Sequence, residues 1–356
     1  MREKLTCAIV DQKEIGQSVI YTLDAEKAYI ISNPNSRKLI CEPEIIGYRI
    51  PVLLQQPIAD ALRYFQEQNF IGNINVAYIL RGGLNFPIEA ACSQIGLNIS
   101  GVSFLTSERI FLENRVSRIE SKYRKINTIN NATVVIGDII ASGETLNNAI
   151  QYIEEQYILA RKALKNIVVF TIGTDNTLKT IDKLNNTLKQ RWNNFEGIWT
   201  VFFEGIFTTY SNVGITGLNL PGVDFVLNGG LLSLEFRLEI TKKCYSIFEK
   251  CSIYDGGARR FEQSDHIDCI VRYWRNLSTL SDNINIVDFI EEKYGYCAIS
   301  FEKWKQINHY GFANRTTLET IYQREQSFIK EIMQSSLREI SEFRLSMLQD
   351  FYAAFV

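Results

Sequence analysis

The chain has 356 residues, of which 46% are hydrophobic and 22% are charged, as in an ordinary globular protein of about two domains. Its 38 basic and 40 acidic residues give a net charge of -2, so no overall charge excess indicates a nucleic acid or a membrane surface as a partner. No apolar run approaches the roughly 18 residues of a bilayer span, and the first residues lack the apolar core of a signal peptide.

The cysteine and histidine content argues against a zinc site. The 7 cysteines contain no C-x-x-C pair, and only 2 histidines accompany them. We therefore expect reduced thiols that mostly fill the core, and a cytoplasmic protein.

Residues 1–55 are predicted to form an extended, partly stranded N-terminal extension. Most of the prolines lie in or directly after this segment, and residues 28–31 and 48–52 have the composition of strands. The extension is a candidate hood over a ligand site.

Residues 56–227 are predicted to form an α/β core. Helical periodicity appears near 58–68, from about 84 to 95, at 144–155 and at 177–192. Apolar runs typical of buried strands alternate with these helices, at 76–80, 99–104, 133–136, 167–170 and 199–203. The pattern predicts a parallel, twisted sheet with helices on both of its faces.

Residues 228–356 are predicted to form a mainly helical C-terminal domain. After Gly311 the chain contains neither glycine nor proline, and apolar residues recur at spacings of three to seven. This pattern favours one or two long amphipathic helices, as a helical cap or a dimer face.

A chemically informative segment lies where one apolar strand gives way to a helix. The strand ends near Asp138, and a short loop then opens the helix with Ala141, Ser142, Gly143, Glu144 and Thr145. Backbone amides at a helix N-terminus favour an anion, and glycine lets the backbone approach a ligand closely. Such a segment suits a sugar phosphate, with hydroxyl donors for the phosphate and a carboxylate for the ribose.

This segment resembles the motif with which type I phosphoribosyltransferases bind phosphoribosyl pyrophosphate (PRPP). In that motif two acids follow two aliphatic residues, and the second acid matches Asp138, while Gly137 takes the place of the first. The resemblance implies that the 5-phosphate binds at 141–145 and the ribose at Asp138. It also implies Mg²⁺, held mainly by PRPP and only indirectly by Asp138.

A second loop one unit upstream strengthens the resemblance. Arg81, Gly82 and Gly83 follow a strand and precede a helix, as in the pyrophosphate loop of the family. Two adjacent glycines allow unusual backbone dihedrals and leave amides able to face pyrophosphate.

The polar stretch 107–125 lies where the family has a mobile loop that closes over PRPP and excludes water. The resemblance makes Lys122 and Tyr123 candidate catalytic residues of that loop. Arg115 and Arg118 are the alternative cationic contacts to pyrophosphate.

The acceptor site is less well defined by the sequence. Asp224, Phe225 and Val226 resemble the stretch of purine enzymes in which an aromatic ring stacks on the base. Ala141 stands where hypoxanthine/guanine enzymes carry a carboxylate, so either Asp138 or Glu144 removes the acceptor's proton or the acceptor arrives as an anion. The polar turn at 254–260 is interpreted as a surface loop.

The sequence thus predicts a Mg²⁺-dependent enzyme that transfers phosphoribosyl from PRPP to a small nitrogenous acceptor and releases pyrophosphate. The alternatives are a non-catalytic regulator that binds PRPP or a nucleotide, and an enzyme with an atypical acceptor in a biosynthetic or bacterial defence system. We expect a homodimer, without a clear nucleic-acid site or a membrane partner.

Overall fold

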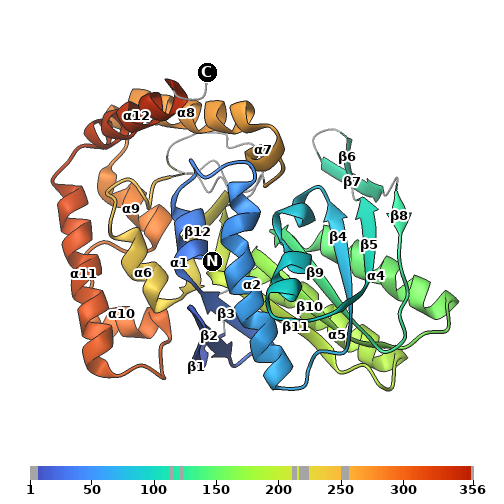
Figure 1. Ribbon diagram of the computed structural model, residues 1–356. Helices are drawn as coiled ribbons and strands as arrows, with labels where there is room; N and C mark the ends of the chain where they lie inside the picture. The colour runs from blue at the N-terminus through green and yellow to red at the C-terminus, as the bar shows by residue number, and fades with distance from the viewer. Residues whose placement is uncertain are drawn as a thin grey trace.

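A computed structural model describes residues 7–106, 108–112, 115–120, 123–210, 215, 224–249 and 256–353 (Figure 1). Its main sheet has the strand order β1-β2-β3-β11-β10-β9-β4-β5-β8, and β12 also pairs with β11. The six strands from β3 to β5 in this order are mutually parallel. The α/β prediction, with a parallel sheet and a helical C-terminal region, is confirmed.

The strands are β1 (Ile9–Ile15), β2 (Ser18–Leu23), β3 (Ala28–Ser32), β4 (Asn73–Leu80), β5 (Ile99–Thr106), β6 (Glu108–Leu112), β7 (Arg115–Glu120), β8 (Arg124–Lys125), β9 (Ala132–Ile140), β10 (Leu164–Thr174), β11 (Gly197–Tyr210) and β12 (Asp224–Leu232). The helices of the first 210 residues are α1 (Pro34–Cys41), α2 (Arg49–Glu67), the 3-10 turn η1 (Gly82–Asn85), α3 (Ile88–Gln94), α4 (Glu144–Leu159) and α5 (Asp175–Arg191). The later helices are α6 (Leu234–Ile240), α7 (Gly256–Phe261), α8 (Gln263–Leu280), the 3-10 turn η2 (Ser281–Asn283), α9 (Ile286–Tyr294), α10 (Phe301–Asn308), α11 (Arg315–Met333) and α12 (Leu337–Ala353).

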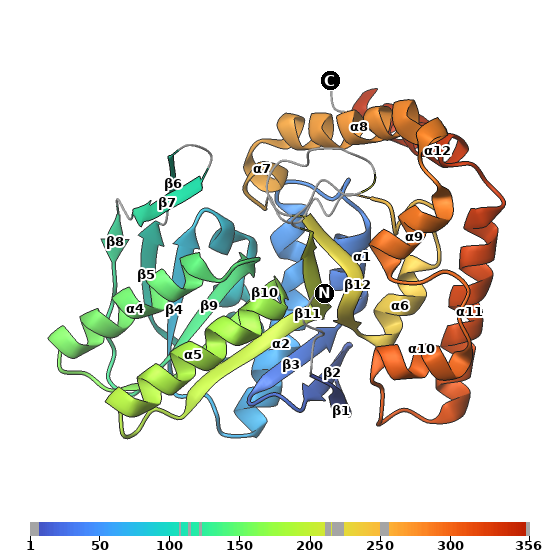
Figure 2. The same ribbon diagram turned by 180° about the vertical axis from the view of Figure 1, so that it is seen from behind.

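Two hydrophobic cores lie on opposite faces of the sheet, because successive side chains of a strand point to opposite sides. On β9, Val134 and Ile136 join the core that α4 and α5 cover. Val135, between them, joins the larger core that contains α2 and α3. Figure 2 shows α4 and α5 side by side across their face of the sheet.

The N-terminal segment is part of the main sheet. β3 pairs with β11 in parallel, and β1 and β2 continue the sheet as an antiparallel hairpin. The expectation of extended chain at 48–52 is wrong, because these residues belong to α2 and the turn before it. Pro51 fits there since the first amides of a helix have no intrahelical acceptor, and the same helix continues through Pro57.

A buried carboxylate joins three regions of the chain. Glu204 on β11 accepts hydrogen bonds from Ser32 Oγ (2.6 Å), the amide of Asn33 (2.8 Å) and Ser233 Oγ (3.1 Å), and also from Ser36 Oγ. Burial raises the pKa of Glu204 to about 7, although these hydrogen bonds oppose the rise. The N-terminal segment, the sheet and the start of α6 therefore share one polar centre.

The C-terminal region is helical and packs around a second buried centre. The two long helices expected after Gly311 are α11 and α12. Arg237 on α6 donates to Glu325 Oε1 on α11 at 3.1 Å, and the two side chains are 4% and 0% exposed. Tyr310, Tyr296 and Asn308 supply further partners of the Arg237 guanidinium. In the described part of the chain, no helix combines the length and the apolar character that a membrane span needs.

Candidate functional site

The two glycine-containing loops meet at one edge of the sheet. β4 and β9 are neighbouring parallel strands, but β4 leads through α3 to β5 on one side, and β9 leads through α4 to β10 on the other. Such a reversal of strand order opens a crevice at the carboxyl ends of the strands, where α/β proteins bind ligands. The segments 81–83 and 141–145 both lie at this crevice.

Close packing joins the first loop to β9, the strand that leads into the second loop. A Cβ atom on Gly83 would lie 3.1 Å from the carbonyl oxygen of Gly137, and one on Gly82 would lie 3.0 Å from Asp138 Oδ1. Larger residues at these positions would push the first loop away from β9. The adjacent glycines therefore let η1 lie directly against the strand that carries Asp138.

The loop before α4 is supported from below by α5 and the end of β10. Gly143 has a φ of +80°, and a Cβ there would lie 2.4 Å from Thr180 Oγ1, so this position requires glycine. Thr174 Oγ1 donates to the carbonyl oxygen of Ala141 at 2.7 Å, and Thr177 Oγ1 donates to that of Ile140 at 3.2 Å. The loop is thereby fixed while the first turn of α4 faces the crevice.

The polar side chains of this loop differ in exposure. Ser142 and Glu144 are exposed, and Thr145 is half-buried. Glu144 stands in the first turn of α4, where a carboxylate interacts favourably with the helix dipole. Asp138 is 9% exposed, and its Oδ1 accepts a hydrogen bond from the amide of Ile139 at 2.9 Å.

The structure explains the glycine that departs from the family motif. A Cβ on Gly137 would lie 2.3 Å from both Cβ and Cγ of Phe86, which is fully buried just after η1. The ring therefore occupies the space that a side chain at 137 would need. Sequence reasoning missed Phe86, and no local pattern pairs it with Gly137, because the contact joins residues about fifty positions apart.

The first loop is covered by residues from the C-terminal region. The peptide bond between Leu80 and Arg81 is cis, and the Arg81 guanidinium pairs with Glu262 at 2.8 Å and lies 5.7 Å from the ring centre of Phe261. Arg260 donates to the carbonyl oxygen of Leu84. The interpretation of 254–260 as a surface loop is therefore wrong for its described part, which forms α7 against this loop.

The stretch between β5 and β9 contains a two-stranded ribbon. β6 and β7 pair as an antiparallel hairpin whose second strand contains Arg115 and Arg118, although their side chains are not among those described. Lys122 lies outside the described residues. Tyr123 is exposed, and its amide bonds to Thr106 Oγ1 at 2.9 Å.

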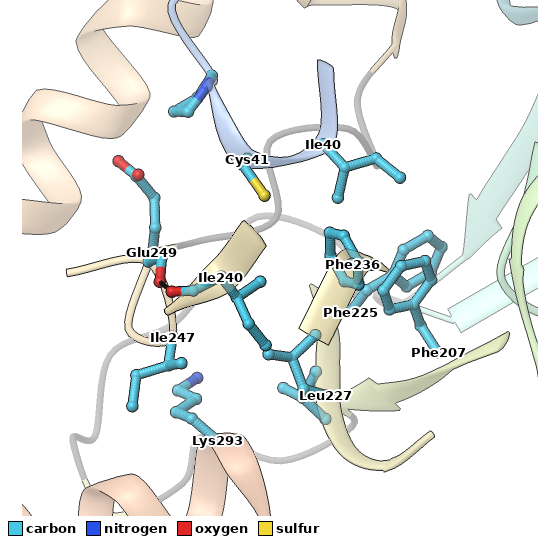
Figure 3. A pocket seen from close by; sticks show the side chains of 13 residues that line it. Ile40, Cys41, Phe207, Phe225, Leu227, Phe236, Ile240, Ile247, Glu249 and Lys293 are labelled. Carbon is cyan, nitrogen blue, oxygen red and sulfur yellow. Dashed lines mark hydrogen bonds between the residues drawn. The ribbon is translucent and has the colours of Figure 1, made fainter. Parts of the chain in front are cut away.

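Two of the three predicted acceptor residues, Phe225 and Val226, line a cavity apart from the two loops. β12 runs antiparallel to β11, and the Phe225 ring stacks on Phe207 with a centroid distance of 6.0 Å and an interplanar angle of 2°. Both rings, together with Val226, line a cavity of about 60 Å³ (Figure 3). Figure 3 shows the aromatic rings on one side of this cavity and Glu249 and Lys293 on the other.

This cavity has no lining residue from 81–83 or 141–145. Phe207 nevertheless pairs with Thr174, which holds the carbonyl of Ala141, so one strand separates the cavity from the loop before α4. Burial raises the pKa of Glu249 to about 7, against the opposing charge of Arg344. The side chain of Asp224 is not among those described.

The donor set at the crevice fits a metal ion held by a substrate. Among the described residues, no three His, Cys, Asp or Glu side chains gather as a metal-binding group. Mg²⁺ commonly binds through one or two carboxylates together with substrate phosphates and waters. The nearly buried carboxylate of Asp138 is a donor of the kind that such an arrangement uses.

No family model and no curated protein matches this chain. Solved structures that align with it include a hypoxanthine phosphoribosyltransferase from Staphylococcus aureus, with 14% identity and a TM-score of 0.28 over 42% of this chain and 72% of that one. A purine phosphoribosyltransferase from Pyrococcus horikoshii aligns with 16% identity and a TM-score of 0.27 over 36% and 75% of the two chains. An adenine phosphoribosyltransferase aligns with 20% identity and a TM-score of 0.27 over 44% and 82%. Similarity at this level does not define a family for the chain.

Proposed function

We propose that the chain binds PRPP at the crevice between β4 and β9 and transfers its phosphoribosyl group to a nitrogenous acceptor. The 5-phosphate binds at 141–145, the ribose hydroxyls at Asp138, and the pyrophosphate at 81–83. Arg115, Arg118, Lys122 and Tyr123 are proposed to close over the bound substrate. The proposal includes a cytoplasmic homodimer that acts with Mg²⁺.

The observation that carries the proposal is the packing of the first loop against β9, the strand that leads into the second loop. Gly82 and Gly83 lie against the end of β9, and the same strand leads into the helix N-terminus at 144. Backbone amides of the loop at 141–145 would bind the 5-phosphate of PRPP, and those of the loop at 81–83 would bind its pyrophosphate. The Asp138 carboxylate would then face the ribose between them. The order of these segments in the sequence supports the same interpretation.

In the proposed reaction a nitrogen of the acceptor forms a bond to C1 of the ribose. The bond from C1 to the pyrophosphate oxygen breaks, and its electron pair leaves with pyrophosphate. The proton of the acceptor passes to Asp138 or Glu144, unless the acceptor binds as an anion. The residues act by positioning and charge stabilisation, and Mg²⁺ supplies positive charge to the leaving pyrophosphate.

A second candidate function is a regulator that binds PRPP or a nucleotide without catalysis. The observation that favours it is the Phe86 ring at the position of the missing first acid, which leaves Asp138 as the matching carboxylate of the motif. The pairing of Arg81 with Glu262 also directs that guanidinium toward the C-terminal region.

Pyrophosphate release distinguishes these functions. The assay combines PRPP and Mg²⁺ with purines, pyrimidines and other nitrogen acceptors, and compares the wild type with Asp138→Asn. We expect release that depends on one acceptor and is lost in the variant. Asp282→Asn is the matched control, because this exposed carboxylate forms an ion pair with Arg338 at the surface and lies far along the chain in η2.

Calorimetric titration with PRPP completes the experiment. Binding without release for any acceptor would favour the regulator. Neither binding of PRPP nor release of pyrophosphate would refute the transferase and any regulator that binds PRPP.

A further inference from the structure

Helix α7 touches the loop to which we assign pyrophosphate. The guanidinium of Arg260 donates to the carbonyl oxygen of Leu84, inside η1, and lies 5.0 Å from the ring centre of Phe261. Arg81, at the start of the same loop, pairs with Glu262 and lies beside the same ring. The loop is thus held at both of its ends by three consecutive residues of the C-terminal region, and Figures 1 and 2 show α7 between that region and the sheet.

The helix that makes these contacts is itself fixed. Arg259 is 1% exposed, and its guanidinium donates to the carbonyl oxygens of Leu39 (3.0 Å) and Ile45 (2.6 Å), and also to that of Glu42. The amide of Gly47 donates back to the carbonyl oxygen of Arg259 at 3.0 Å. These bonds tie α7 to the turn between α1 and α2, so Arg260 approaches Leu84 from a fixed support.

The loop needs such a support because of its composition. Gly82 and Gly83 have more backbone freedom than other residues, and a loop that orders only on binding loses affinity through that ordering. Gly83 packs against β9 on one side of the loop. A charged hydrogen bond from Arg260 to the carbonyl of Leu84, the residue after the two glycines, is a second restraint on the loop.

We infer that Arg260 is a positioning residue for the pyrophosphate loop, through which the C-terminal helical region takes part in binding PRPP. This inference rests on the proposed function of the loop. Arg260 acts on the substrate through the backbone of η1 and does not touch it. Loss of its side chain should therefore weaken ligands that contain pyrophosphate and spare those that contain only the 5-phosphate.

The test measures the dissociation constants of three ligands for the full chain by calorimetry. PRPP and inorganic pyrophosphate, each with Mg²⁺, require the loop at 81–83, whereas ribose 5-phosphate requires only 141–145 and Asp138. For Arg260→Met we expect PRPP and pyrophosphate to bind about tenfold more weakly, the loss typical of a hydrogen bond to a charged group, and ribose 5-phosphate to bind as before. Arg260→Lys should recover part of the loss.

Arg275→Met is the matched control, because it removes an exposed arginine from α8. It should leave all three affinities unchanged. An unchanged affinity for PRPP in Arg260→Met, or an equal loss for all three ligands, would overturn the inference. If the wild type binds neither PRPP nor ribose 5-phosphate, the proposed function itself fails. This failure is recognised in the wild type, whereas failure of the inference about Arg260 is recognised only by comparing the variant with the wild type.

Discussion

Alanine at position 137 is expected to destabilise the protein through Phe86. The added Cβ would lie 2.3 Å from Cβ and Cγ of Phe86 and 2.9 Å from its Cδ1, where carbon atoms normally approach to about 3.5–4.0 Å. β9 is hydrogen-bonded on both sides, to β4 and to β10, so its backbone cannot move away. Phe86 is fully buried and lies 6.1 Å from the ring centre of Phe203, so its own space is restricted.

The expected cost follows from these contacts. Overpacking a rigid core costs about 1–3 kcal/mol, and this site belongs at the upper end because neither partner can shift. The replacement of glycine in a strand returns about 0.5–1 kcal/mol. We therefore expect Gly137→Ala to lower the free energy of unfolding by about 2 kcal/mol, measured by urea denaturation.

A double-mutant cycle isolates the contact. Phe86→Gly alone should cost at least about 3–5 kcal/mol, but it removes the Cβ and the ring carbons that the new methyl group would meet. The double variant should then be no less stable than Phe86→Gly, a coupling of about 2 kcal/mol. Gly311→Ala is the control, since no atom lies within 4 Å of a Cβ there. Strictly additive costs, or a Gly137→Ala variant as stable as the wild type, would refute the reasoning.

Three further predictions concern the buried charges and the loop before α4. Arg237→Met should lower the free energy of unfolding by about 3–5 kcal/mol, because it leaves Glu325 buried without its partner. The control Lys242→Met, at an exposed ion pair, should change it by less than about 1 kcal/mol. Equal effects of the two variants in thermal unfolding would contradict this prediction. Between about pH 4.5 and 7 the folded chain keeps a proton on Glu204, whose pKa is about 7, while the unfolded chain releases it at the ordinary glutamate pKa of 4.5. The free energy of unfolding therefore falls as the pH rises through this window. Glu204→Gln should make this decline shallower, as measured by urea midpoints at pH 5 and pH 8. An unchanged difference between the two midpoints would show that Glu204 does not cause the decline. Gly143→Ala places a side chain at a φ of +80° and should therefore weaken the binding of ribose 5-phosphate by about tenfold in calorimetry. An unchanged affinity for ribose 5-phosphate would contradict this prediction.

Most of the core and both long C-terminal helices could be predicted from the sequence. A buried strand such as β9 is recognised by a run of apolar residues, and a helix such as α4, α11 or α12 by amphipathic periodicity. Both patterns involve only residues near one another in the chain. The two loops were found in the same way, since Gly82–Gly83 and the segment at 141–145 directly follow strands. Parallel strands bring their carboxyl ends to one edge, so the sequence also indicated that these loops share a site.

The sequence by itself determined the order of the core elements and the residue types at the two loops. The tertiary structure alone decided that β3 joins the sheet, that α7 reaches the first loop through Arg260, and that Phe86 fills the space beside Gly137. Each of these is a contact between residues far apart in the chain, and no local periodicity encodes such a contact. The physical reason is that strand pairing and close packing depend on which surfaces the completed fold brings together, whereas local propensity depends on neighbours along the chain.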